Sequence, residues 1–181
     1  MSISAIEEKA VELPDVVSMS LVGRTLSMKG KLGEAKKDFL KVNVNLSVKG
    51  NKIVVTPFSE KKKDNVVINT VLSILNNMVT GVTKGYTYKL KIVYAHFPIS
   101  VKTKGDEILV ENFVGERSPR VAKIVGVCKV TVDGDDVLVK GVSVEDIGQT
   151  AANVELATKI KRKDQRVFLD GLYIYEKLEG W

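Results

Sequence analysis

The stretch Val132-Asp133-Gly134-Asp135-Asp136-Val137-Leu138-Val139 combines a tight turn with an apolar strand that follows it. Asp-Gly is a strong hairpin dipeptide, because both residues tolerate the positive φ angles that a two-residue turn requires. Before the turn, Cys128 and Val130 alternate with polar or small residues, as they do in a half-buried strand. These features predict a β-hairpin over residues 125–139.

A second copy of this pattern lies earlier in the chain. Val48-Lys49-Gly50 precedes Val132-Asp133-Gly134 by 84 residues, and the apolar strand that follows it, Ile53–Val55, precedes Val137–Val139 by the same distance. Other blocks recur in the same order at an offset of 82 residues: Gly23 with Gly105, Gly33-Glu34 with Gly115-Glu116, and Leu90–Val93 with Leu172–Tyr175. Blocks that recur in one order at a nearly constant offset indicate an internal duplication.

The first repeat is predicted to contain strands and one helix. The predicted strands are Val16–Leu21, Arg24–Met28, Val42–Val48, Lys52–Thr56 and Tyr86–Tyr94, with turns at Val22-Gly23 and Gly50-Asn51. Between the last two strands, Val67, Val71, Ile74-Leu75 and Met78 fall at helical spacing. Asp64 or Asn65 can cap the start of this helix, and Gly81 is expected just past its end.

The second repeat has the same predicted order. Two short strands surround Lys104-Gly105 within residues 100–110, and the hairpin of residues 125–139 follows. A helix is predicted from about Val144 to Ile160, because Ser143 and Asp146 have the spacing of a capping pair. Phe168–Tyr175 is the predicted closing strand.

This order predicts the fold class. A helix that joins two strands of one sheet forms a crossover unit. We therefore expect an α+β protein, a tandem duplication of a small mixed β-sheet domain with one helix packed on one face. The N-terminal repeat is assigned to residues 1–82, with its last strand, about 86–95, preceding the linker, and the C-terminal repeat to residues 83–181. The linker is expected at Ala95–Pro98, because Pro98 interrupts the strand pattern and disfavours helix before it.

The residues offer little for catalysis or metal binding. The chain has one histidine, His96, and one cysteine, Cys128, whereas a structural zinc site needs about four such ligands. Cys128 lies in an apolar run and is expected to be a structural thiol, and a lone cysteine indicates a reducing compartment. The first residues are acidic, and no long apolar run predicts a membrane span. We therefore expect a cytoplasmic protein with no cofactor, no metal and no membrane association.

The distribution of positive charge is more informative than its total. Lys+Arg number 28 against 22 Asp+Glu, a net charge of +6. The densest cluster follows the second predicted helix and is a candidate RNA-binding segment: Lys159, Lys161, Arg162, Lys163, Gln165 and Arg166. Cations suit the end of a helix dipole, but that explains only one or two of them. A segment this basic can follow the phosphates of a folded RNA, and a solvated charged loop remains the alternative.

Two further segments are candidate RNA contacts. One is the expected flexible loop of residues 29–37, which carries Lys29, Lys31, Lys36 and Lys37. The other is Thr83-Lys84-Gly85, where Gly81 and Gly85 would let the backbone approach a ligand closely. The chain lacks the aromatic pattern with which an RRM stacks bases across its sheet. RNA contacts are therefore expected from basic loops to the backbone rather than from base stacking on a sheet.

Three stretches carry a specific resemblance to a known family, and the match to that family covers nearly the whole chain. They are Leu75–Tyr86 (Leu-Asn-Asn-Met-Val-Thr-Gly-Val-Thr-Lys-Gly-Tyr), Val93–Pro98 (Val-Tyr-Ala-His-Phe-Pro) and Lys161–Gly171 (Lys-Arg-Lys-Asp-Gln-Arg-Val-Phe-Leu-Asp-Gly). They resemble the large ribosomal subunit protein six family, in its archaeal type. Bacterial members carry a longer loop with a Pro-Glu-Pro-Tyr-Lys-Gly-Lys-Gly type motif, which this sequence lacks. Contacts of the bacterial proteins are therefore not transferred.

The resemblance implies a fold and a function. The fold is a tandem duplication of one α/β domain. The function is that of a structural constituent of the large ribosomal subunit, which binds large-subunit rRNA near the sarcin–ricin loop and the stalk base. Neighbouring large-subunit proteins are implied partners. The C-terminal repeat is implied to be the main rRNA-binding domain, through the segment that corresponds to Lys159–Arg166.

One hypothesis of another class remains at this point. It is a small enzyme or anionic-metabolite-binding protein on a duplicated α/β frame, with basic loops holding the metabolite. Such a protein needs a concave polar site with perturbed titratable groups. No motif in the sequence points to such a site.

Overall fold

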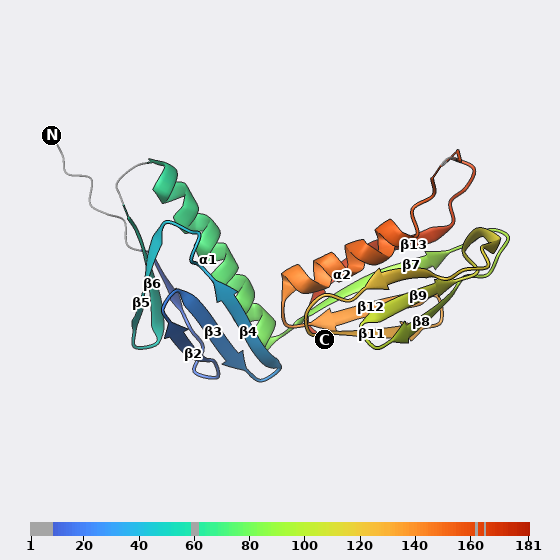
Figure 1. The fold of residues 1–181 in the computed structure, drawn as a ribbon. Helices are drawn as coiled ribbons and strands as arrows, with labels where there is room; N and C mark the ends of the chain where they lie inside the picture. The colour runs from blue at the N-terminus through green and yellow to red at the C-terminus, as the bar shows by residue number, and fades with distance from the viewer. Residues whose placement is uncertain (1–8, 59–61, 162, 165) are drawn as a thin grey trace. The chain divides into compact units, whose positions relative to one another are not determined.

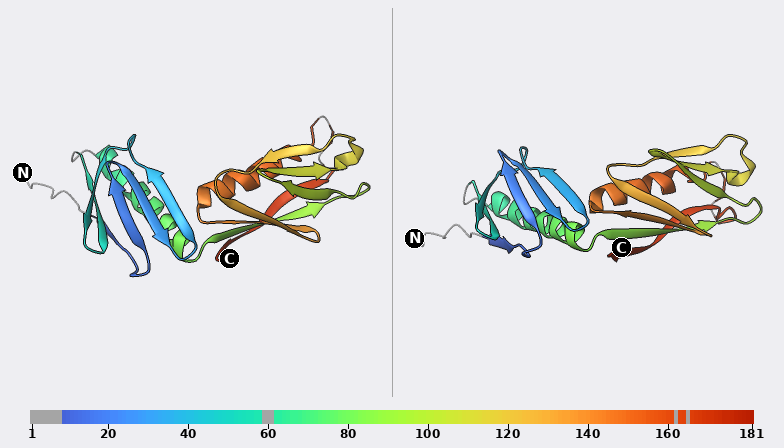
Figure 2. Two further views of the ribbon diagram at one scale, coloured as in Figure 1. Left: turned by 60° about the horizontal axis from the view of Figure 1, so that its bottom comes forward. Right: turned by 90° about the horizontal axis from the view of Figure 1, so that it is seen from below.

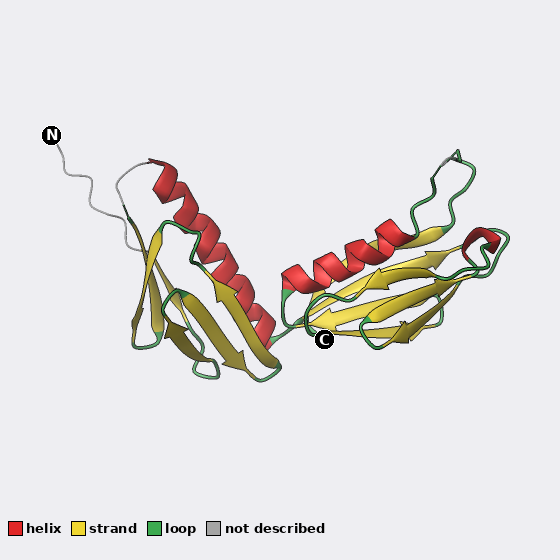
Figure 3. Ribbon diagram, in the orientation of Figure 1, coloured by secondary structure: helices red, strands yellow, loops and turns green. Residues whose placement is uncertain are grey.

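The chain folds into two compact units, residues 1–84 and 85–181. A computed structural model describes residues 9–58, 62–161, 163–164 and 166–181, with the side chains of residues 62–65 left out (Figure 1). Each unit combines antiparallel strands with one long helix, so the predicted α+β class is confirmed (Figure 3).

The first unit contains two small sheets and helix α1. One sheet has the strand order β1-β6-β5 and the other β2-β3-β4. The elements are β1 (Lys9–Glu12), β2 (Ser18–Val22), β3 (Thr25–Gly30), β4 (Gly33–Asp38), β5 (Val44–Lys49), β6 (Lys52–Pro57) and α1 (Lys62–Thr83). The predicted hairpin around Gly50-Asn51 is confirmed, with Lys49 opposite Lys52 in the register of β5 and β6.

Helix α1 supplies the core of the first unit. Its buried residues recur every three or four positions, which places them on one face of the helix: Ile68, Val71, Leu75, Met78 and Val82. This face packs against β1, β3, β4, β5 and β6. By length and composition alone, Val66–Thr83 is apolar enough to cross a membrane. The burial of its apolar face against both sheets is that of a core helix.

The second unit contains a four-stranded sheet, β11-β12-β7-β13, and a three-stranded sheet, β10-β9-β8. The elements are β7 (Tyr86–Val93), β8 (Ser100–Lys104), β9 (Glu107–Glu111), the 3-10 turn η1 (Phe113–Gly115), β10 (Arg120–Lys123), β11 (Cys128–Asp133), β12 (Asp136–Gly141), α2 (Val144–Ala157) and β13 (Gly171–Glu179). Helix α2 packs on β7, β12 and β13 and also contacts β10, so it joins the two sheets around one core. Ile147, Ala151 and Val154 of α2 are fully buried there.

Both units share one order of elements. A three-stranded antiparallel sheet comes first, then a hairpin and then a helix, so that β2-β3-β4, β5-β6 and α1 correspond to β8-β9-β10, β11-β12 and α2. The matched glycines have matched conformations. Gly23 and Gly105 have φ angles of 63° and 58°, and Gly50 and Gly134 have φ angles of 60° and 57°. Figure 2 shows from two further sides that each helix runs along the strands of its own unit.

The strand at residues 86–93 exists as predicted, but its assignment to the first repeat is wrong. β7 lies in the sheet of the second unit, between β12 and β13. There it takes the position that β1 has in the first unit, because each pairs antiparallel with the second strand of a hairpin. Leu90–Val93 and Leu172–Tyr175 are therefore pairing partners rather than equivalent strands, with Leu172 opposite Ile92. Apolar alternation indicates a strand but does not say which strand it pairs with.

The linker expected at Ala95–Pro98 is corrected for the same reason. Residues 94–98 form a loop inside the second unit, between β7 and β8. The two units meet instead between Lys84 and Gly85. The backbone turns there, since Lys84 N–H donates to the carbonyl of Thr80 and Gly85 has a φ angle of 80°.

Smaller details also differ from the sequence expectations. Every pairing between described strands is antiparallel, so none of the four described sheets is mixed. The crossover through α2 does join two strands that run in the same direction, but β7 lies between them. Helix α1 begins before Asp64, so Asp64 does not cap its start. It continues past Gly81 to Thr83, so Gly81 does not mark its end. Helix α2 stops at Ala157, while its predicted cap is confirmed, because the Ser143 hydroxyl accepts a hydrogen bond from Asp146 N–H.

Gly85 has a structural partner within its own unit. A Cβ atom at this position would overlap the indole of Trp181. The C-terminal segment is held there by hydrogen bonds from Gly180 N–H to the Gly85 carbonyl (2.9 Å) and from the Trp181 indole to the Gly141 carbonyl (3.1 Å). The close approach predicted for Gly85 is therefore made by the chain's own tryptophan.

Replacing Ile147 by alanine tests the core of the second unit. Because Ile147 is fully buried, we expect Ile147→Ala to lower the free energy of unfolding by about 2–5 kcal/mol in chemical denaturation. Val127→Ala is the control, since Val127 is 95% exposed, and it should change stability by less than about 0.5 kcal/mol. Equal effects of the two variants would contradict the described core.

Gly85→Ala tests the seat of Trp181. A left-handed alanine costs about 1–2 kcal/mol, and the new methyl group should also displace the indole. Because the chain has one tryptophan, displacement should change its fluorescence emission. Gly105→Ala is the matched control: its φ angle is also positive, but nothing lies near its Cβ position, so the emission should stay unchanged. Unchanged emission in Gly85→Ala would show that Trp181 does not rest on Gly85.

Candidate nucleic-acid interface

The basic segment of residues 159–166 belongs to the connection between α2 and β13. Hydrogen bonds to the rest of the second unit hold this connection at both ends. Thr158, the residue that follows α2, is buried; its hydroxyl donates to the carbonyl of Val154 (3.2 Å) and accepts from Leu172 N–H at the start of β13 (3.1 Å). Ile160 is also buried. One buried hydroxyl therefore joins the end of α2 to the start of β13, the two elements between which the segment lies.

The described cations of this segment are exposed to solvent. Lys159, Lys161, Lys163 and Arg166 are all exposed, while Arg162 and Gln165 lie outside the described residues. The Lys163 ammonium lies 4.6 Å from the centre of the Phe168 ring, a cation–π contact. The Arg166 guanidinium bonds to the Asp164 carboxylate (3.0 Å), and this hydrogen bond lowers the pKa of Asp164. The segment therefore presents positive charge to solvent with part of its geometry held by local contacts.

Arg120 supports the base of the segment. Its guanidinium donates to the carbonyls of Ala157 (2.8 Å) and Lys159 (3.3 Å) and pairs with the Glu116 carboxylate (2.6 Å). It also lies over the ring of Phe113, 4.1 Å from the ring centre. The hydrogen bond from Arg120 lowers the pKa of Glu116. Sequence reasoning missed Arg120, because it is distant in sequence from the segment and lies in no cluster of cations.

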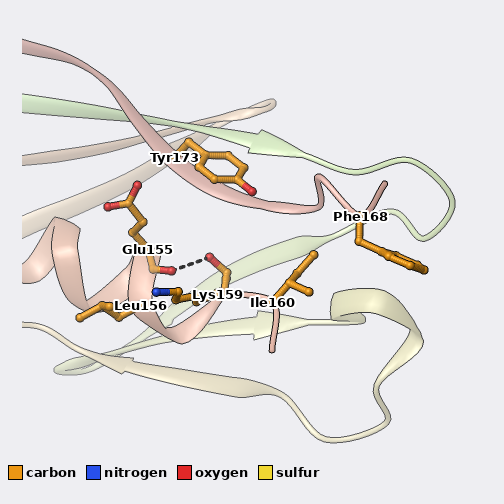
Figure 4. Close-up of a pocket in the computed structure, with 7 residues that line it drawn as sticks. Glu155, Leu156, Lys159, Ile160, Phe168 and Tyr173 are labelled. Carbon is orange, nitrogen blue, oxygen red and sulfur yellow. Dashed lines mark hydrogen bonds between the residues drawn. The ribbon is translucent and has the colours of Figure 1, made fainter. Parts of the chain in front are cut away.

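A shallow pocket of about 370 Å³ lies beside the segment. It is lined by residues from the end of α2, the segment, the residues between the segment and β13, and β13 itself: Glu155, Leu156, Thr158, Lys159, Ile160, Phe168 and Tyr173 (Figure 4). The hydroxyls of Thr158 and Tyr173 donate to backbone carbonyls, so Glu155 and Lys159 are the remaining polar side chains of the lining. No group of three or more His, Cys, Asp or Glu residues in the described chain can hold a metal ion.

The expected flexible loop of residues 29–37 is wrong. Most of these residues belong to β3 and β4, which form a tight hairpin with its turn at Lys31-Leu32. The hairpin rests on the end of α1, because Leu32 N–H donates to the Val82 carbonyl (3.2 Å) and a Cβ at Gly30 would lie 2.6 Å from that oxygen. Lys36 pairs with Glu34 on the same strand (3.3 Å), and Lys37 is half-buried.

This packing brings two predicted segments together. Lys29 and Lys31 are exposed at the hairpin, and Lys84 is exposed just beyond Val82. The three cations therefore belong to one end of the first unit. Thr83 differs, because its hydroxyl donates to the Val79 carbonyl (2.7 Å) within the helix.

The lone histidine and cysteine lie in different settings. Cys128 is half-buried at the start of β11, its thiol donates to the Val125 carbonyl (3.1 Å), and burial raises the pKa of the thiol. His96 is exposed in the loop between β7 and β8. A raised thiol pKa disfavours the reactive thiolate.

Comparison with known proteins is consistent with the duplication. A family model described as ribosomal protein L6 matches the chain twice, at residues 13–85 and 97–171. β7 lies between the two matched ranges, as expected for a strand that precedes the second copy. Large ribosomal subunit protein uL6 of Archaeoglobus fulgidus is 46% identical over 176 residues, which cover 94% of this chain and 90% of that protein.

Other archaeal relatives are similar over the same range. The uL6 protein of Methanobrevibacter smithii is 42% identical, with 98% of this chain and 99% of the relative covered. That of Aeropyrum pernix is 44% identical, with 92% of each covered. The resemblance noted in the sequence, including its archaeal character, is confirmed. On the two matches of the family model and the identity of these relatives, the chain belongs to the ribosomal protein L6 family.

Proposed function

We propose that this protein binds large-subunit rRNA near the sarcin–ricin loop and the stalk base, chiefly through the basic segment 159–166 of its second unit. Family membership supports the coarser statement, that the chain is a structural protein of the large ribosomal subunit in the cytoplasm and not an enzyme. The observation that carries the finer proposal is the group of exposed cations on a segment anchored at both ends: Lys159, Lys161, Lys163 and Arg166.

The anchoring matters for binding. A flexible basic tail loses conformational entropy when it is ordered on RNA, whereas a segment already held by Thr158 and Arg120 loses less. Asp164 holds the Arg166 guanidinium, which limits its motion but also offsets part of its charge. Lysine ammonium groups then meet phosphates as point charges, and release of counterions from the RNA favours the complex. Arg162 and Gln165 belong to the proposed interface by their place in the segment.

A secondary contact is proposed at the end of the first unit. Lys29, Lys31 and Lys84 are exposed on neighbouring backbone segments there, and Lys36 and Lys37 continue along β4. Thr83 and Gly85 contribute through the backbone turn that presents Lys84 rather than through direct contact. The remaining proposed partners are neighbouring large-subunit proteins near the stalk base.

The charge-removal test uses Lys159→Ala with Lys161→Ala in the full chain. Both side chains are exposed, so the melting temperature should barely move. Affinity for a transcribed rRNA fragment that contains the sarcin–ricin loop should fall. The slope of log affinity against log salt should become shallower by about 1–2, because each lost phosphate contact removes counterion release.

The matched control is Lys104→Ala with Lys123→Ala. Both lysines are exposed in the same unit. Lys104 ends β8 and Lys123 ends β10, and each lies opposite Glu107, at the end of the sheet that is far from η1. The control should retain its salt slope. If both double variants lose affinity equally, only total charge matters and the proposed interface is wrong.

A further inference from the structure

The loop of residues 94–98, between β7 and β8, exposes aromatic side chains beside the basic segment. Tyr94 and Phe97 are 44% and 46% exposed, and His96 between them is also exposed. Val93, the last residue of β7, lies opposite Gly171, the first residue of β13. The loop therefore leaves the sheet where the basic segment returns to it. Exposed aromatic rings are costly in water, so a cluster of them indicates an interaction site.

A buried carboxylate ties this loop to the basic segment. The Asp170 side chain is only 7% exposed, and its Oδ1 atom accepts a hydrogen bond of 2.7 Å from Ala95 N–H. Asp170 lies between the basic segment and β13, directly before Gly171. The position of the aromatic rings is thereby coupled to that of the cations.

The other side of the loop rests on the turn around η1. Asn112 donates to the Pro98 carbonyl (3.0 Å), and the Phe97 ring lies against Gly115, where a Cβ would be 3.3 Å away. Asn112 and Val114 both have positive φ angles, of 57° and 51°. A branched residue such as valine rarely adopts this conformation, and strained backbone of this kind is concentrated at functional sites. The aromatic loop is thus held from two sides rather than free in solution.

The charges around the loop indicate what binds it. Lys161, Lys163 and Arg166 lie on the β13 side, and Arg117 is exposed in the η1 turn. The acidic tip of the β11–β12 hairpin lies on the other side of β7, because Ile92 N–H donates to the Asp135 carbonyl there. A phosphate backbone would therefore approach from the basic side. The loop that carries Tyr94 and Phe97 starts on that side, because Val93 at the end of β7 lies opposite Gly171 at the start of β13.

We propose that the loop of residues 94–98 is a base-stacking site, at which an unpaired base of the RNA bound by the basic segment stacks on Phe97 and Tyr94. This inference rests on the proposed function. Stacking on aromatic side chains tolerates any base, since every base has a π face. It therefore adds affinity at a fixed point on the RNA without requiring a particular base there.

The test replaces Tyr94 and Phe97 together by leucine in the full chain. Leucine keeps an apolar side chain but removes the ring. Affinity for the same rRNA fragment should fall by about five-fold or more, as expected for loss of one stacked base. The salt slope should stay at the wild-type value, because no phosphate contact is lost. Tyr175→Leu is the control: Tyr175 is also exposed in the second unit but lies on β13, and its loss should leave affinity unchanged.

A second pair of variants separates stacking from folding. Tyr94→Phe and Phe97→Tyr keep the rings and should retain wild-type affinity. Ultraviolet cross-linking of the wild-type complex should attach a nucleotide to the tryptic peptide of residues 92–102. Wild-type affinity in the leucine double variant, or equal losses in the ring-preserving variants, would overturn the proposal. If the leucine double variant binds the rRNA fragment normally but is not incorporated into large subunits, the loop contacts a protein instead of a base. That result would also overturn the proposal.

These results are distinguishable from failure of the proposed function. If Lys159→Ala with Lys161→Ala leaves affinity and salt slope unchanged, the basic segment is not the RNA interface. If that variant behaves as expected and the leucine double variant binds like wild type, only the stacking inference fails.

Discussion

The pairing of β7 with both β12 and β13 is the interaction on which the second unit depends. β12 and β13 run in the same direction and cannot pair through a short turn, so the helix between them must cross the sheet. β7 fills the position between them and satisfies the backbone of both strands. It also brings Leu90 and Ile92 into the core beside Leu172. The end of β7 and the start of β13 consequently meet at one corner, where the candidate interface is built.

The candidate interface is held by polar groups that the fold buries rather than by the cations themselves. Thr158 joins the end of α2 to β13 through one hydroxyl, and Asp170 joins the segment to the loop after β7. Arg120 donates to the carbonyl of Ala157, which has no partner within the helix because it ends α2, and to the carbonyl of Lys159 in the segment. Buried polar groups with all their partners give a single defined arrangement. The lysines are therefore displayed on a scaffold whose geometry does not depend on them.

The two units share one architecture but differ in the connections between their elements. In the first unit the β3–β4 hairpin rests on the end of α1 through Gly30 and Leu32, which leaves only a short exposed turn. In the second unit the matching region contains η1 and its strained residues, and the segment after the helix is long. The duplication explains the shared core, since both copies bury the same hairpin under a helix. Divergence is concentrated in the connections, where changes leave the buried pairs intact.

Much of the architecture follows from local features of the sequence, because these act over short distances. Asp133-Gly134 and Gly50-Asn51 determine hairpins, the spacing of Val71, Leu75 and Met78 determines a helix, and the clustering of Lys159–Arg166 marks a basic segment. The partner of β7 was decided only by tertiary structure, because apolar alternation is the same whichever sheet buries the strand. Tertiary structure also decided three further contacts: the support from Arg120, the hydrogen bond from Ala95 to Asp170 and the contact of Gly85 with Trp181. Each of these joins residues that are distant in the chain, and packing of the whole unit selects such pairs while local propensity does not.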